Sequence, residues 1–169
     1  LEWNASVMMY PEYETDFRLR YEIMQFFAAK NDITKATEFA RETIKSADLV
    51  KQPGEDTRKH LAVARHDAYH VIGVHLYDQK QFDEAIAAFR KAIEAERYAE
   101  GYYWIGMCEW EKKLVDEAID SFAKAEVLGG DIAPKAKERM EQLYKAIHND
   151  TTIGIEKVYR RAKEELGLS

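Results

Sequence analysis

Apolar residues recur at helical spacing along most of the chain. Within residues 14–30, Leu19 and Ile23 belong to a stripe that falls on one face of a helix. A second stripe of the same period covers residues 33–46, and Asp32 just before it can act as an N-cap. The pattern therefore predicts two helices separated by a short turn.

Breaks in this pattern divide the rest of the chain into further helices. Glycine, proline and capping residues mark the breaks, because each of them suits a helix end better than a helix interior. We predict that Asp56 or Thr57 is the N-cap of a long helix that ends at about Asp78, and that the next helix starts at Phe82. Gly129 is predicted to end a helix, and Pro134 to lie in the first turn of the following one. Thr151 or Thr152 is predicted to be the N-cap of the last helix.

Two stretches of the chain repeat at an offset of 33 residues. The matched pairs include Tyr69/Tyr102, Ile72/Ile105, Gly73/Gly106, Ala85/Ala118, Phe89/Phe122 and Ala92/Ala125. In each unit the glycine would let another helix approach closely, the alanines would face that approach, and the phenylalanine would fill the space between units. A single helix pair cannot bury its apolar face alone, so the pairs must stack.

This arrangement of aromatic, aliphatic-Gly, Ala, Phe and Ala positions resembles the tetratricopeptide repeat. The resemblance implies an all-α fold, a right-handed α-solenoid of about three helix pairs with a C-terminal capping helix. It divides the chain into an extended N-terminal arm (1–12) and one helical domain (13–169) that contains a degenerate repeat (17–46), an insertion loop (47–56), two repeats (66–98 and 99–131) and C-terminal helices (134–148 and 151–167).

The resemblance also implies a concave groove lined by the first helix of each pair. The groove positions of that family fall here on Tyr21, His70, Val74, Tyr77, Tyr103, Met107 and Trp110. Family members that grip an acidic chaperone C-terminus carry Lys, Arg and Asn at such positions, so this sequence argues against that role. An apolar helix or extended segment with basic flanks is the better ligand. The alternative is that these rings only pack on one another or on the arm.

Composition narrows the classes of function. The net charge of −6 argues against a binder of nucleic acid, which needs a basic face. No apolar run approaches the roughly 20 residues of a membrane span. Cys108 is the single cysteine, which excludes an internal disulfide. We expect a soluble protein, cytoplasmic or periplasmic/secreted after signal removal, and the start at Leu1 indicates a processed or trimmed chain.

No constellation of catalytic residues is evident in the sequence. His66 and His70 stand four residues apart, which is metal-ligand spacing, but no third ligand lies at a diagnostic distance. We read one histidine as facing the groove and the other as a surface residue. Nucleotide-binding and nucleophile-elbow motifs are missing too, so we expect no catalytic residue, no metal and no cofactor.

The sequence thus favours a non-catalytic protein–protein interaction module, an adaptor or scaffold subunit of a larger complex. It would hold an apolar or helical segment in its aromatic groove. The alternative is a self-assembling structural protein, in which the arm of one copy occupies the groove of the next and forms a homo-oligomer. A metal site based on His66 and His70 is the least favoured hypothesis.

Overall fold

The computed structural model describes residues 16–168 of the chain, and within them every regular element is a helix. The all-α fold is therefore confirmed, while the predicted arm (1–12) lies outside the described residues. The helices are α2 (Phe17–Ala29), α3 (Ile33–Asp48), α4 (Glu55–Asp78), α5 (Phe82–Ala95), α6 (Ala99–Glu111), α7 (Val115–Leu128), α8 (Ala133–Ile147) and α9 (Glu156–Leu166).

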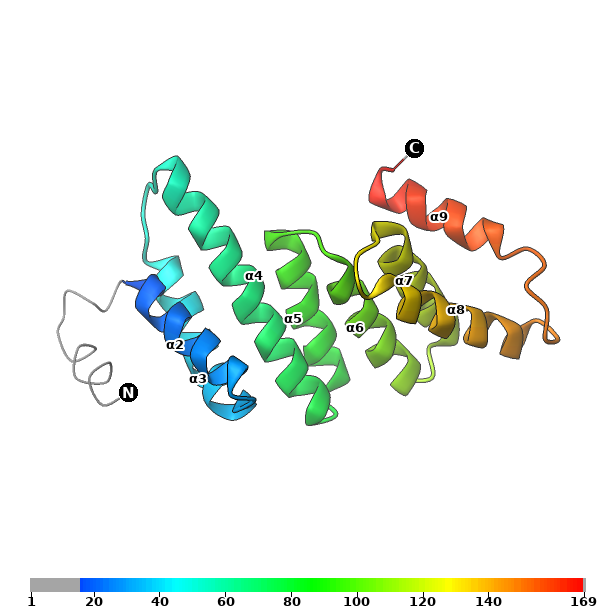
Figure 1. Ribbon diagram of the computed structural model, residues 1–169, viewed down its shortest axis with the longest axis horizontal. Helices are drawn as coiled ribbons and strands as arrows, with labels where there is room; N and C mark the ends of the chain where they lie inside the picture. Colours follow the sequence, from blue (N-terminus) through cyan, green and yellow to red (C-terminus); the bar gives the residue numbers. More distant parts are fainter. Residues whose placement is uncertain (1–15, 169) are drawn as a thin grey trace.

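Successive helices pack in pairs, and the pairs follow one another along the molecule. Helix α2 packs against α3, α4 against α5, and α6 against α7. Each second helix also contacts the first helix of the next pair, and α4 touches both α2 and α6. Figure 1 shows the result as a row of helices from α2 and α3 at one end to α8 and α9 at the other. None of these helices, over residues 16–168, is both long and apolar enough to cross a membrane.

The repeated glycines make room for an aromatic ring. A Cβ built on Gly73 would lie 2.6 Å from Cε1 of Phe89, and one built on Gly106 would lie 2.9 Å from Cδ1 of Phe122. Both phenylalanines are fully buried. The close approach expected at each glycine thus exists, but the group that approaches is the phenyl ring of the second helix of the same pair.

The buried residues form several clusters along the row. At one end, Phe17 of α2 packs with Ala47 of α3 and with Leu61 and Ala64 of α4. At the other end, a cluster centred on Phe122 joins α7 to α8 and α9. Each cluster therefore stabilises mainly the helices next to it, as expected for stacked repeats.

Five of the predicted helix ends agree with the structure, among them the end of α4 at Asp78 and the start of α5 at Phe82. Asp32 caps α3, and its side chain accepts a hydrogen bond from the Lys35 backbone nitrogen at 3.1 Å. Gly129 ends α7 with a φ of 83°, and Pro134 lies in the first turn of α8.

Two other predicted caps were wrong. Helix α4 begins at Glu55 after Gly54, ahead of Asp56 and Thr57, which puts two carboxylates into its first turn, where the helix dipole favours them. Helix α9 begins only at Glu156. Thr151 instead accepts a hydrogen bond from the Ile153 backbone nitrogen at 3.1 Å, so it stabilises a turn before the helix.

The predicted insertion is partly helical. Helix α3 continues through Asp48, and α4 extends over 24 residues where α6 has 13. The extra turns of α4 are held because Leu61 and Ala64 are buried and because Arg65 forms an ion pair with Asp48 at 2.8 Å. The division of residues 13–169 into repeats remains a prediction.

Helix α9 covers one side of α7. Val158 and Ala162 are buried in the same cluster as Ile119 and Ala123 of α7. Around this contact, the Tyr159 hydroxyl donates to Glu126 at 2.5 Å, and Arg161 forms an ion pair with Asp120. An apolar stripe faces α7 while charged residues face outward, as expected of an end helix.

Candidate partner-binding surfaces

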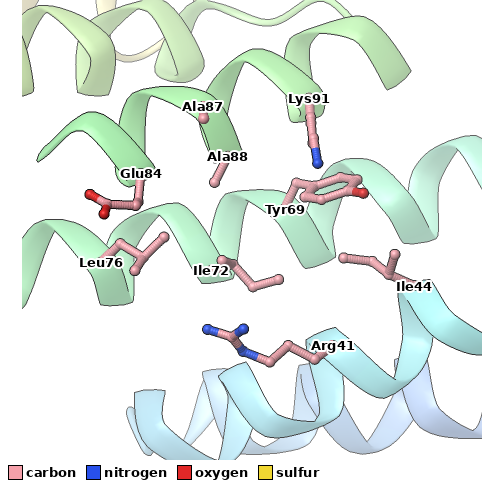
Figure 2. A pocket seen from close by; sticks show the side chains of 9 residues that line it. All are labelled: Arg41, Ile44, Tyr69, Ile72, Leu76, Glu84, Ala87, Ala88 and Lys91. Atoms are coloured by element: carbon pink, nitrogen blue, oxygen red, sulfur yellow. The ribbon is translucent and has the colours of Figure 1, made fainter. Parts of the chain in front are cut away.

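A groove that the sequence pattern did not predict lies between the first and second helix pairs. Helices α3, α4 and α5 border it, and its volume is about 460 Å³. We call it the first inter-pair groove; Arg41, Ile44, Tyr69, Ile72, Leu76, Glu84, Ala87, Ala88 and Lys91 line it (Figure 2).

The first inter-pair groove has an apolar floor and charged edges. Ile72 and Leu76 of α4 form the floor beside Ala88, and Arg41 reaches toward them from α3. Above Tyr69, the Lys91 ammonium nitrogen lies 5.3 Å from the ring centroid, a cation–π contact. Glu84 lies beside Leu76, at the end of the groove away from Lys91 (Figure 2).

The predicted groove residues occupy a different face, formed by the first helices α2, α4 and α6. We call the set Tyr21, His70, Val74, Tyr77, Tyr103, Met107 and Trp110 the first-helix face; each member keeps part of its side chain exposed. The structure does not gather them into one cluster. Val74 and Tyr77 pack against the buried residues around Phe89, whereas Tyr103, Met107 and Trp110 pack against those around Phe122.

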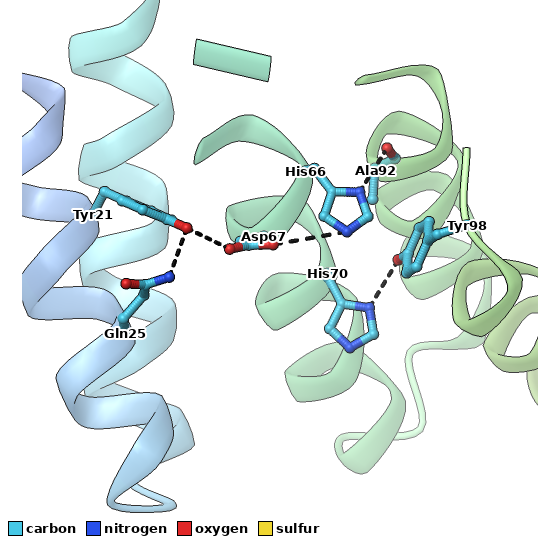
Figure 3. A network of polar contacts seen from close by, with 7 residues as sticks. All are labelled: Tyr21, Gln25, His66, Asp67, His70, Ala92 and Tyr98. Carbon is cyan, nitrogen blue, oxygen red and sulfur yellow. Dashed lines mark hydrogen bonds and ion pairs between the residues drawn. The ribbon is translucent and has the colours of Figure 1, made fainter. Parts of the chain in front are cut away.

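Hydrogen bonds fix the part of this face where α2 meets α4. The Tyr21 hydroxyl donates to Asp67 at 2.6 Å and accepts from the Gln25 side-chain nitrogen at 2.6 Å (Figure 3). Burial and the Asp67 carboxylate together raise the pKa of Tyr21 well above its ordinary value, so the phenol keeps its proton. Tyr21 thus forms hydrogen bonds with its hydroxyl and apolar contacts with its ring.

The two spaced histidines are engaged in separate contacts. His66 Nδ1 lies 3.3 Å from the Ala92 carbonyl oxygen, and its Nε2 lies 3.7 Å from Asp67 (Figure 3). His70 Nδ1 forms a 2.8 Å hydrogen bond with the Tyr98 hydroxyl. Burial, followed by the charge of His66, lowers the pKa of His70 and favours the neutral imidazole. Within residues 16–168 no three His, Cys, Asp or Glu side chains are grouped to hold a metal ion.

The aromatic members of the first-helix face are held by neighbouring side chains. Tyr77 makes an edge contact with Trp104 at a centroid distance of 5.2 Å. Tyr103 lies 5.5 Å from the Phe122 ring, and the Arg139 guanidinium lies 5.0 Å from the Trp110 ring centroid. One side of each ring is therefore packed and the other remains partly exposed.

Two differences between the repeats are the sequence signal for the first inter-pair groove. At the 33-residue offset, Leu76 corresponds to Glu109 and Ala88 corresponds to Ser121. Both differences fall on the floor of the groove. If the residues were identical, the two repeats would form similar grooves. A search that scores only identical residues ignores these positions.

Comparison with known proteins agrees with the repeat found in the sequence. Residues 70–137 match a family model described as "Tetratricopeptide repeat". The match begins within α4, covers α5, α6 and α7, and ends in α8. No curated protein matches the chain. Together with the stacked helix pairs, this match shows that the chain contains tetratricopeptide repeats within residues 70–137.

Proposed function

We propose that this chain is a non-catalytic adaptor or scaffold subunit that holds a segment of a partner protein on its first-helix face. Repeats of this family generally mediate protein–protein interaction. The observation that carries the proposal is that Tyr77, Tyr103 and Trp110 remain partly exposed although each ring is already fixed by a neighbour. Such aromatic side chains are typical anchors at interfaces.

Fixed rings favour binding because little side-chain freedom remains to be lost. Ordering a mobile side chain at an interface costs about 0.5–1.5 kcal/mol. Tyr77 and Trp110 are already restrained by Trp104 and Arg139. Met107 and Val74 add apolar surface on the same helices, so an apolar or helical segment is the ligand we infer.

Site-specific photo-crosslinking in the native source tests this proposal. A benzoylphenylalanine replaces Tyr77 or Trp110 in the full chain, and the matched control carries it at Ala146, an exposed position of α8. We expect a protein adduct of defined mass from the first two positions and none from the control. The proposal fails if adducts form equally at Ala146, or if no partner is captured at either ring position.

A further inference from the structure

The first inter-pair groove has a counterpart one repeat further along. Arg90, Ile93, Glu94, Tyr102, Ile105, Glu109, Ser121 and Lys124 line a smaller hollow of about 300 Å³ between α5, α6 and α7, which we call the second inter-pair groove. The 33-residue offset superposes Tyr69 on Tyr102 and Lys91 on Lys124. The cation–π contact recurs as well, with the Lys124 nitrogen 5.9 Å from the Tyr102 centroid.

The walls of the two grooves correspond in the same way. The alignment that places Ala36 on Ala85 places Arg41 on Arg90 and Ile44 on Ile93. Each groove therefore has an arginine on the preceding helix and a lysine on the following one. The two positive charges face a common floor.

A carboxylate of the chain itself lies on the floor of the second groove. Glu109 is buried there and accepts a hydrogen bond from the Ser121 hydroxyl at 2.6 Å. Burial raises the pKa of Glu109, and the Ser121 hydrogen bond and the charges of Arg90 and Lys124 act against that rise. Lys124 itself forms an ion pair with Glu165 at 2.5 Å, so a cation at this position of the repeat is available to pair with a carboxylate.

The first groove offers the same two cations without that carboxylate. Leu76 and Ala88 stand in place of Glu109 and Ser121, which leaves an apolar floor and a larger volume. Among residues 16–168, no carboxylate lies within ion-pair distance of Arg41 or Lys91. Glu84, which lines the groove, lies at the end away from Lys91 (Figure 2).

We propose that the first inter-pair groove is a second binding site, for a peptide segment of a partner protein that carries an Asp or Glu side chain flanked by apolar side chains. The peptide carboxylate is held by Arg41 and Lys91, which line the first groove as Arg90 and Lys124 line the second. The apolar side chains cover Ile72 and Leu76. A carboxylate that is paired with cations and partly removed from water gains more than an exposed ion pair does.

Peptide selection on the full chain tests this site. A displayed library of random 12-residue peptides is selected against the protein, and binding of the enriched peptides is measured by fluorescence polarisation. We expect enrichment of Asp or Glu beside apolar residues. Changing that single acidic residue to its amide should weaken binding about tenfold, as for loss of one charge-assisted hydrogen bond.

Variants of the groove locate the binding. The double change Leu76→Glu with Ala88→Ser copies the floor of the second groove and should lower affinity at least tenfold. Arg41→Gln and Lys91→Gln alter exposed side chains, and each should weaken binding at least threefold. Arg90→Gln is the matched control in the second groove and should leave peptide affinity unchanged.

Three outcomes would overturn the assignment. Selected peptides without an acidic preference would remove its chemical basis, and so would an Arg90→Gln effect equal to that of Arg41→Gln. The N-terminal segment also carries carboxylates, Glu2, Glu12 and Glu14. If changing all three to Gln raised peptide affinity tenfold, the occupant would be the chain's own segment and not a partner.

Discussion

In each of the two repeats, a phenyl ring packs against the backbone of a glycine. The Phe89 ring contacts the backbone of Gly73 so closely that any Cβ there would overlap it, and Phe122 does the same at Gly106. Because both rings are fully buried, neither can move aside without disturbing its neighbours. The glycine and the phenylalanine therefore act as one unit in packing the two helices of a pair.

The change Gly73→Ala tests this unit. We expect it to lower the free energy of unfolding by about 1 kcal/mol, because an overpacking cost of about 1–3 kcal/mol exceeds the helix-propensity gain of about 1 kcal/mol. Urea unfolding followed by circular dichroism measures the change. Gly106→Ala should have the same effect, since a Cβ there would lie 2.9 Å from Cδ1 of Phe122. A more stable Gly73→Ala variant would contradict the prediction.

Glu109 gives a second prediction at the residue scale, on the dependence of stability on pH. Burial raises its pKa above the ordinary value of 4.5. The folded state therefore binds the Glu109 proton more tightly than the unfolded state does. The stability that protonation of Glu109 contributes is fully present below pH 4.5. This stability is lost as the pH rises through the raised pKa of the folded state.

Glu109→Gln removes this ionisation and keeps an oxygen for the Ser121 hydroxyl. We expect the free energy of unfolding of the variant, relative to the unmodified chain, to increase as the pH rises from 4 to 7. Unfolding in urea at several pH values provides the measurement. A difference that is constant across this range would mean that Glu109 has the same pKa in both states.

At the scale of helices, the sequence predicts those helix ends that are set by interactions between residues close together in the chain. The cap at Asp32 and the end at Gly129 follow from side-chain and backbone chemistry within one turn. The start of α9 was misplaced because Thr151 forms an ordinary local hydrogen bond in a turn, and a sequence pattern cannot distinguish this from a helix cap.

The candidate sites were harder to predict for a related reason. Periodicity identifies which residues share a face of a helix, and family resemblance selected the first-helix face. Whether a face is open depends on what the next helix places over it. The first inter-pair groove has an apolar floor because α4 carries Leu76 where α6 carries Glu109. The effect of this difference can be seen only once α3, α4 and α5 are placed together.

Helix α9 provides a prediction at this scale. Val158→Asp places a charge in the buried contact with Ile119 and Ala123, so we expect α9 to detach while the earlier pairs remain folded. Trypsin should then cleave within α9, after Arg160, Arg161 or Lys163, at least tenfold faster. Lys157→Asp, at an exposed position of the same helix, is the control and should leave that rate nearly unchanged. Equal cleavage of the two variants would argue against the packing of α9 on α7.

At the scale of the whole molecule, we expect the two ends of the row of helices to be stabilised largely independently of each other. Phe17 belongs to a cluster with Ala47, Leu61 and Ala64, and none of these residues contributes to the cluster around Phe122. In a stack where each pair contacts mainly its neighbours, local opening at one end need not require opening at the other.

Phe17→Ala tests how far a local change is transmitted. Removing a buried phenyl group costs about 3–5 kcal/mol, and we expect this loss to appear as faster amide hydrogen exchange in α2, α3 and the first turns of α4. Exchange in α7 and α8 should stay within about threefold of the unmodified chain, because a nearest-neighbour stack confines the loss. Phe122→Ala is the reciprocal variant and should raise exchange in α6, α7 and α8 while sparing α2. If either variant raised exchange uniformly from α2 to α9, the chain would unfold as one cooperative unit, and the separate clusters would have no independent stability.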